Sequence, residues 1–419
     1  MRRRHLLLAG AGLGAAALLA LRPGAAGAPH AAYFQRLATA LKRAGVNTPS
    51  IVVDHAILRQ NTAQLLRNLD GKLALRSVVK SLPSLPLLQE LMRQSGSDKT
   101  MLFSLPQLIA LAPHSPDILL GKPMPVAAAA QFYQRAGAPA PGRRVQWLID
   151  TPRRLAQYRE LARGAGLTLE LNLEIDVGLH RGGLASRQDM AECAQLIRSE
   201  PRLRYSGLMG YDAHIAKLPD VGTLQADALA YAQAQYAGCA AFMRERLGAP
   251  VAPPTYNTAG SPTYRLYGGG GVQNEVAIGS ALLKPGDFDT PLLADLQPAC
   301  WIATPVLKAL PQFQMPRGVE WLGAFARGWD ANQRHAYFIY GGNWLADPVS
   351  PAGLAASRLY GASSNQQLLL GSGLQGLQAD DYVFFRPRQS ETVLQQFGPL
   401  AVYQSGQIAQ FWEPLPASG

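Results

Sequence analysis

The sequence predicts an α/β fold: a (β/α)8 TIM-type barrel followed by a mainly antiparallel β domain. From about residue 50, short apolar runs rich in β-branched residues alternate with longer amphipathic runs, which is typical of strand–helix units around a parallel sheet. Eight such units close into a barrel. The strand candidates lie at 73–79, 100–104, 117–121, 145–150, 169–176, 203–210, 253–258 and 274–279.

A further strand and helix precede these units. The stretch "SIVVD" at 50–54 is β-branched and ends on Asp54, which is a good helix N-cap. The run from His55 to Leu69 then places its large apolar side chains on one helical face. This region predicts a strand followed by an amphipathic helix, and we set the start of the barrel domain at residue 48.

The pattern changes after about residue 290, where prolines, glycines and short strands replace the long amphipathic runs. "HAYFIYGG", "DYVFFRP" and "LAVYQSGQIAQFW" are typical of short antiparallel strands. We therefore predict a barrel domain at 48–290 and a β domain at 291–415, with residues 33–47 as a candidate to pack on the latter.

Residues 1–28 predict an export signal. An arginine cluster is followed by an apolar run from Leu6 to Leu21 and then by small residues. Arg3 and Arg4 before "HLL" resemble a twin-arginine signal, which implies export to the periplasm in a folded state. Cleavage would fall between Gly27 and Ala32. The alternative is an uncleaved N-terminal membrane anchor, for which the apolar run is short.

Composition restricts the classes of function. The formal net charge of the 419 residues is +11, and removal of residues 1–28 would take away four arginines and no acidic residue, leaving +7. The remaining basic residues are dispersed, so nucleic acid is not expected as a partner, whereas anionic small ligands are compatible with the charge. The three cysteines are too far apart in sequence for a zinc motif and imply no disulfide framework.

Candidate site residues stand where the predicted strands end, because active sites of such barrels lie at the C-terminal ends of the strands. Lys80 ends the first strand, Asp176 the fifth, and Tyr211 and His214 follow the sixth. A lysine in a closed barrel reaches solvent, loses its charge or forms an imine. Taken alone, Lys80 is better explained as a solvated loop lysine, and only its combination with other residues favours a role in chemistry.

Two glycine-containing loops differ in what they predict. Arg181 follows the fifth strand in "EIDVGLHRGG", where the glycines permit a tight loop close to a ligand. The alternative for Arg181 is an ordinary surface arginine. The run "GGGG" at 268–271 lacks the helix start that a phosphate-binding loop needs, and we interpret it as a flexible loop.

In combination, these stretches resemble the alanine-racemase-like (fold type III) pyridoxal phosphate enzymes, in particular the D-threonine aldolase and D-serine dehydratase branch. The resemblance covers nearly all of the chain after the leader. "RSVVK" at 76–80 keeps the arginine and lysine of the family's R-P-H-x-K but has serine and valine in place of proline and histidine. "EIDVGLHRGG" at 174–183, "YDAH" at 211–214 and "AGSPTY" at 259–264 match three further motifs of the family in order and spacing.

The resemblance implies pyridoxal 5'-phosphate as cofactor and a role for each matched residue. Lys80 would bind the cofactor covalently and then act as a base at the substrate α-carbon. Arg181 would hydrogen-bond the phenolic oxygen of the cofactor, Tyr211 would face its pyridine nitrogen, and His214 would pack beside its ring. For His214, a buried structural histidine is the alternative.

The loop after the seventh strand would hold the phosphate. The resemblance assigns this role to the backbone at Gly260 and Ser261, to the Ser261 hydroxyl and to Thr263 or Tyr264, since a glycine turn presents several donors to an anion. Asp176 would fix the Arg181 loop without acting in catalysis.

The chain departs from the family at the divalent metal, which relatives hold through a "P-N-H-x-C/D" motif near the C-terminus. Here "RPRQSETVL" puts Gln389 in place of the histidine and Glu391 in place of the cysteine or aspartate. The family's upstream "E-H-G" is replaced by "NQQ" at 365–367. Glutamine is a poor zinc ligand. Two hypotheses stay open: Gln389 and Glu391 contact substrate, with Glu391 as a general acid or base, or they are ordinary residues of a degenerate metal site.

The expected function is that of an exported pyridoxal phosphate lyase acting on a D-amino acid, by retro-aldol cleavage of a β-hydroxy substrate or by β-elimination. One alternative is a metal-independent racemase or deaminase on the same scaffold. Another is a cofactor-binding protein with little turnover. A homodimer is implied by the resemblance only.

Overall fold

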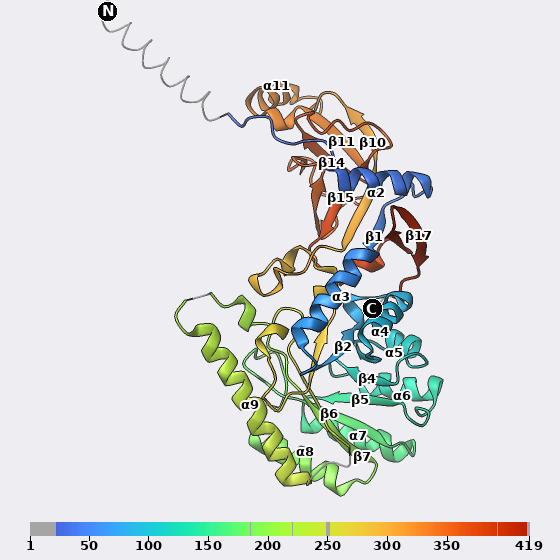
Figure 1. Cartoon of the computed structure of the whole chain (residues 1–419), viewed down its shortest axis with the longest axis vertical. Coiled ribbons are helices and arrows are strands. Elements are labelled where there is room, and N and C mark those ends of the chain that lie inside the picture. The colour runs from blue at the N-terminus through green and yellow to red at the C-terminus, as the bar shows by residue number, and fades with distance from the viewer. Residues whose placement is uncertain (1–21, 185, 220, 249–251, 392, 417–419) are drawn as a thin grey trace, which may run out of the picture. The chain divides into compact units, whose positions relative to one another are not determined.

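The computed structural model describes residues 22–416, except 185, 220, 249–251 and 392 (Figure 1). The predicted leader at 1–28 therefore falls largely outside the described residues. The chain divides into two compact units. The barrel unit comprises residues 53–300, 388–400 and the described residues from 411 onward, and the second unit comprises the described residues up to 52 with 301–387 and 401–410.

This division differs from the boundaries predicted from the sequence in one respect that matters for the site. Residues 388–400, which the sequence placed in the β domain, belong to the barrel unit. The backbone N–H of Asp287 donates to the carbonyl of Arg388 at 3.0 Å, and the Ser280 and Ser390 hydroxyls lie 3.0 Å apart. These contacts place Gln389 and Glu391 against the barrel.

Eight parallel strands form a closed barrel in chain order, which confirms the predicted fold class. Strand β9 pairs with β2, with Ala74 opposite Glu275 and Ser77 opposite Ile278, and so closes the ring. Each predicted strand overlaps an observed one. The strands are β2 (Ala74–Val78), β3 (Lys99–Leu102), β4 (Asp117–Leu120), β5 (Arg144–Ile149), β6 (Leu169–Glu174), β7 (Leu203–Met209), β8 (Thr255–Thr258) and β9 (Glu275–Ile278).

α-Helices lie between consecutive strands except between β8 and β9, and they cover the outside of the barrel (Figure 1). Side-chain caps mark several starts: Asp54 accepts a hydrogen bond from the backbone of Ile57, and Ser104, Thr151 and Ser186 cap later helices in the same way. The helices are α3 (His55–Leu69), α4 (Leu85–Ser95), α5 (Leu105–Leu111), α6 (Val126–Ala136), α7 (Pro152–Gly164), α8 (Arg187–Ser199), α9 (Leu224–Leu247) and α10 (Ser280–Leu283).

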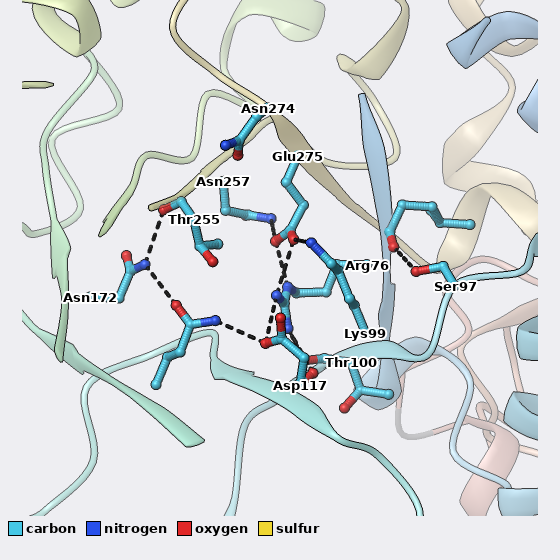
Figure 2. Close-up of polar contacts among 12 residues, drawn as sticks. Arg76, Ser97, Lys99, Thr100, Asp117, Asn172, Thr255, Asn257, Asn274 and Glu275 are labelled. Atoms are coloured by element: carbon cyan, nitrogen blue, oxygen red, sulfur yellow. Dashed lines mark hydrogen bonds and ion pairs between the residues drawn. The ribbon is translucent and has the colours of Figure 1, made fainter. Parts of the chain in front are cut away.

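A buried polar cluster crosses the barrel interior (Figure 2). Arg76 on β2 is fully buried and bonds Glu275 on β9 through Nε–Oε1 at 2.5 Å and Nη2–Oε2 at 3.0 Å. Its Nη2 also bonds Asp117 Oδ1 on β4 at 3.0 Å, and Lys99 Nζ lies 2.9 Å from Glu275. A buried guanidinium needs such partners to offset its desolvation. The cluster therefore ties together β2, β3, β4 and β9.

The second unit contains most of a nine-stranded, mainly antiparallel sheet, again as predicted. Its order is β13-β14-β11-β10-β1-β16-β17, and β15 pairs with β10 and β12. Helix α2 (Ala32–Arg43) buries Leu37 and Leu41 in one cluster with Trp301 and Phe384. The strands are β1 (Ser50–Asp54), β10 (Cys300–Leu310), β11 (His335–Tyr340), β12 (Ala346–Ser350), β13 (Ala355–Ala356), β14 (Gln366–Gly371), β15 (Tyr382–Pro387), β16 (Leu400–Gln404) and β17 (Gln407–Trp412).

One further helix, α11 (Glu320–Trp329), belongs to the second unit. Among the residues that the structure describes, no helix is both long and apolar enough to cross a membrane.

Candidate active site

A cavity opens at the C-terminal ends of the barrel strands, where the active sites of such barrels lie. Residues that follow seven of the eight strands line it, together with one residue from the segment at 388–400. The lining residues include Lys80, Ser81, Phe103, Arg181, Tyr211, Gly260, Ser261, Gly279, Ser280 and Glu391.

Lys80 lies in the short 3-10 helix Val79–Ser81 that directly follows β2. Its Nζ is 2.9 Å from Oε1 of Glu391 and 4.7 Å from the centroid of the Phe103 ring. The Ser81 hydroxyl donates to the same Glu391 oxygen at 3.2 Å. The side chains of Lys80 and Glu391 are each 37% exposed. The amine is thus held at the cavity wall by a carboxylate and an aromatic face.

Arg181 and Tyr211 form a second pair. The guanidinium carbon of Arg181 lies 5.0 Å from the centroid of the Tyr211 ring, a cation–π contact. Burial raises the pKa of the Tyr211 phenol, and the nearby Arg181 charge opposes that rise. The phenol is therefore neutral at physiological pH.

Position 260 accommodates only glycine without displacement, because its backbone lies close to the Tyr211 ring. A Cβ atom added at Gly260 would stand 2.7 Å from Cε2 of Tyr211, closer than carbon atoms can approach without displacement. The glycine therefore allows the loop after β8 to contact the Tyr211 ring at the cavity wall.

The Ser261 hydroxyl accepts hydrogen bonds from two backbone N–H groups of the segment after β9. Its Oγ accepts hydrogen bonds from the N–H of Gly279 at 3.2 Å and of Ala281 at 3.1 Å. A Cβ atom at Gly279 would stand 2.7 Å from Cβ of Ser81. The close approach of two loops brings a hydroxyl and two backbone N–H groups together beside the cavity, an arrangement that suits an anion.

Thr263 and Tyr264 do not line the cavity. The Thr263 hydroxyl is buried and donates to Oδ1 of Asp212 at 2.6 Å, while the Tyr264 hydroxyl accepts from Asn68 Nδ2 at 2.8 Å. Asp212 also accepts from the Tyr267 hydroxyl. These two predicted phosphate ligands lie instead behind the loop and hold it in place.

His214 is likewise absent from the residues that line the cavity. The Nδ1 atom of this histidine is buried and has no hydrogen-bond partner among the described residues. A Cβ atom at Gly178, in the loop that carries Arg181, would lie 3.3 Å from its Nε2. Asp176 fixes that loop by accepting from the backbone of Gly178 at 2.9 Å and of His180 at 3.0 Å.

Gln389 and Glu391 lie at one edge of the site. A second hollow shares Lys80, Tyr211, Ser280 and Glu391 with the main cavity and adds Gln389. The Gln389 amide donates to Oδ2 of Asp287 at 3.1 Å. Within the part of the chain that the structure describes, no group of three His, Cys, Asp or Glu side chains could hold a metal ion.

Sequence reasoning missed three contributors to the site. Gly279 and Ser280 were available as a glycine–serine pair directly after the eighth strand, in "IGSALL". Asp212 stands inside the matched "YDAH" stretch, but nothing in the sequence reveals its contacts with Thr263 and Tyr267.

Comparison with known proteins defines the class. The family model for the alanine racemase N-terminal domain matches residues 53–285, which is more than half of the chain. The protein belongs to this family.

Individual relatives are more distant. The 3-hydroxy-D-aspartate aldolase of Paracoccus denitrificans (strain Pd 1222) is 23% identical over 163 residues, which span 38% of this chain and only 40% of that relative. The crystal structure of D-threonine aldolase from Filomicrobium marinum has a TM-score of 0.70 at 18% identity, covering 89% of this chain and 96% of that one. D-threo-3-hydroxyaspartate dehydratase from Delftia sp. HT23 gives a TM-score of 0.66 at 16% identity, with 88% and 97% covered. These structures share the fold.

Proposed function

We propose that the protein is a pyridoxal phosphate-dependent lyase that acts on a D-amino acid with a hydroxyl group on its β-carbon. The observation that carries this proposal is that three features lie at one cavity, at the end of the barrel where active sites are found. They are Lys80, the Arg181–Tyr211 pair and the Ser261 cluster, which consists of Ser261 and the backbone N–H groups of Gly279 and Ala281. The segments after five strands, β2, β6, β7, β8 and β9, supply groups of the types that such a cofactor needs.

The residues present fit the cofactor. Lys80 supplies an amine at the cavity wall, and Ser261, whose Oγ accepts from the backbone N–H groups of Gly279 and Ala281, supplies a hydroxyl donor for a phosphate. The arginine next to Tyr211 supplies a charge for an anionic oxygen. When bound, the cofactor would supply an electron sink for negative charge at the substrate α-carbon.

The chain's own groups then have separate tasks. Lys80 would hold the cofactor covalently and, after exchange with the substrate amine, would carry a proton to or from the α-carbon. Arg181 would donate to the ring oxygen of the cofactor. Tyr211, as a neutral phenol, would not protonate a ring nitrogen.

The substrate class is supported by the names of the relatives. D-threonine and the two 3-hydroxyaspartates are D-amino acids with a hydroxyl group on the β-carbon. We include both retro-aldol cleavage and β-elimination in the proposal, because both begin from that group. Export through residues 1–28 and a homodimer stay predictions.

The proposal is tested with purified full-length protein and added cofactor. We expect an absorbance band at about 420 nm that disappears on borohydride reduction and is absent in Lys80→Ala. A panel of D- and L-amino acids should then give an aldehyde with glycine, or a keto acid with ammonia, only from β-hydroxy D-amino acids. A colourless protein would contradict the proposal, and conversion of D- to L-amino acids would show a racemase instead.

A further inference from the structure

We propose that Glu391 transfers the proton of the substrate's β-hydroxyl group, so that this enzyme acts on its β-hydroxy substrate without a metal ion. The inference rests on the proposed function and deepens it. It assigns a chemical role to a residue at a position where relatives, by resemblance, use a metal ligand.

The first support is the position of Glu391 next to Lys80. Its Oε1 lies 2.9 Å from the lysine amine and accepts from the Ser81 hydroxyl at 3.2 Å. Lys80 acts at the α-carbon, and the β-oxygen is two bonds away from that atom. A carboxylate within hydrogen-bond distance of the amine is therefore placed to reach the β-oxygen of the same substrate.

The second support is that the segment carrying Glu391 is fixed to the barrel. Ser390 is buried and its hydroxyl lies 3.0 Å from that of Ser280, next to the Ser261 cluster. Gln389 is held by Asp287 at 3.1 Å. A catalytic carboxylate needs such fixed neighbours on both sides, because small displacements are costly for proton transfer.

The third support is the chemistry of the surrounding groups. Gln389 contributes an amide, and Glu391 already faces an ammonium group, so neither is arranged to ligate a cation. The other ionisable groups at this hollow are Tyr211, Lys217 and Asp287. Lys80 is a free amine again after it exchanges with the substrate amine, and Glu391 beside it is placed to take the proton of the β-hydroxyl group.

Glu391 and Lys80 together account for both proton transfers of retro-aldol cleavage. The β-hydroxyl gives its proton to Glu391, the Cα–Cβ bond breaks, and the β-carbon leaves as an aldehyde. The electron pair stays at the α-carbon, to which the Lys80 ammonium group then returns a proton, giving glycine. In β-elimination Lys80 removes the α-proton, and protonated Glu391 gives its proton to the departing hydroxyl, which leaves as water. Neither route consumes an oxidant or reductant.

The test compares Glu391→Gln with Glu192→Gln, which makes the same chemical change at an exposed position on helix α8. Two measurements report on the intact site: the cofactor band with its pH titration, and exchange of the α-hydrogen of D-alanine for deuterium. D-Alanine has no β-hydroxyl, so its exchange needs Lys80 but not Glu391.

We expect Glu391→Gln to keep the band and the exchange, while cleavage of D-threonine falls roughly 100-fold or more. The titration of the band should move to lower pH, because a negative charge beside the protonated nitrogen is lost. Glu391→Asp should recover part of the cleavage, and Glu192→Gln should match the unchanged enzyme in every measurement.

Cleavage by the unchanged enzyme should survive treatment with EDTA. Loss of cleavage in EDTA with recovery on adding Mn²⁺, or cleavage at the full rate by Glu391→Gln, would overturn the inference while leaving the proposed function intact. Absence of both the band and the exchange in the unchanged protein would instead refute the proposed function.

Discussion

Arg76 and Glu275 form a two-point ion pair inside the barrel, on the two strands that close it. The distances are 2.5 and 3.0 Å, and both side chains are almost fully buried. Glu275 also accepts from Asn257 at 2.9 Å, and Asn257 lines the cavity. The ion pair therefore connects the two strands that close the barrel with Asn257, a residue of the candidate site.

Removal of the Arg76 charge is expected to destabilise the barrel. In Arg76→Met, the carboxylates of Glu275 and Asp117 lose the buried guanidinium that they share, and only Lys99 still pairs with Glu275. This loss should lower the free energy of unfolding by about 3–5 kcal/mol. Urea denaturation followed by circular dichroism measures the change. Arg67→Met, on the exposed face of α3, is the control and should change stability by about 0.5 kcal/mol at most. Equal effects of the two substitutions would show that the buried cluster contributes little.

The same cluster predicts how stability depends on pH. Burial alone would raise the pKa values of Glu275 and Asp117, but the Arg76 charge holds both below their usual range. A lowered pKa stabilises the fold above the unfolded value of about 4, and this contribution is lost as pH falls through the folded value. The stability difference between the unchanged protein and Arg76→Met should therefore shrink between pH 7 and pH 3. A difference that stays constant over this range would contradict the assignment.

Two glycines close in sequence should respond differently to alanine. Gly260→Ala places a methyl group 2.7 Å from the Tyr211 ring, whereas a Cβ atom at Gly268 meets nothing within 4 Å. We expect Gly260→Ala to weaken cofactor binding by roughly 10-fold or more, because the ring or the loop must move. Gly268→Ala should bind as the unchanged protein does. Titration of each apoprotein with cofactor measures the affinities. Equal affinities of the two variants would show that the contact between position 260 and Tyr211 does not contribute to cofactor binding.

Asp212 should stabilise the loop after β8 through its two hydroxyl partners. Asp212→Ala leaves the buried hydroxyls of Thr263 and Tyr267 without an acceptor, at a cost of about 1–3 kcal/mol for each group. Burial raises the pKa of Asp212, so its charged form destabilises the folded state at neutral pH. The uncharged Asp212→Asn should therefore be the milder change. Thermal unfolding at pH 7 orders the variants, and greater damage from asparagine than from alanine would contradict this role.

Much of the fold could be predicted because its signals are local. The barrel strands are short runs that alternate with longer amphipathic ones, and the N-caps Asp54, Ser104 and Thr151 are visible in the sequence. Lys80, Arg181 and Tyr211 could be brought together from the rule that the C-terminal ends of parallel strands meet at one end of a barrel.

Contacts between distant segments could not be predicted. Nothing near Glu391 in the sequence indicates that its segment leaves the β sheet and packs on the barrel, because serine and glutamine at 389–390 are compatible with any polar loop. Thr263 or Tyr264 was predicted to hold the phosphate together with Ser261, whereas in the structure their hydroxyls bond Asp212 and Asn68. Their burial depends on Asp212 and Asn68, which come from other elements.

The central claim, that Lys80 binds the cofactor, is tested most directly by chemical trapping. The protein is loaded with pyridoxal phosphate, reduced with borohydride, digested and mapped by mass spectrometry. We expect the pyridoxyl group on the peptide that contains Lys80 and on no other lysine. A label on Lys217 or Lys284, or no label at all, would contradict the account.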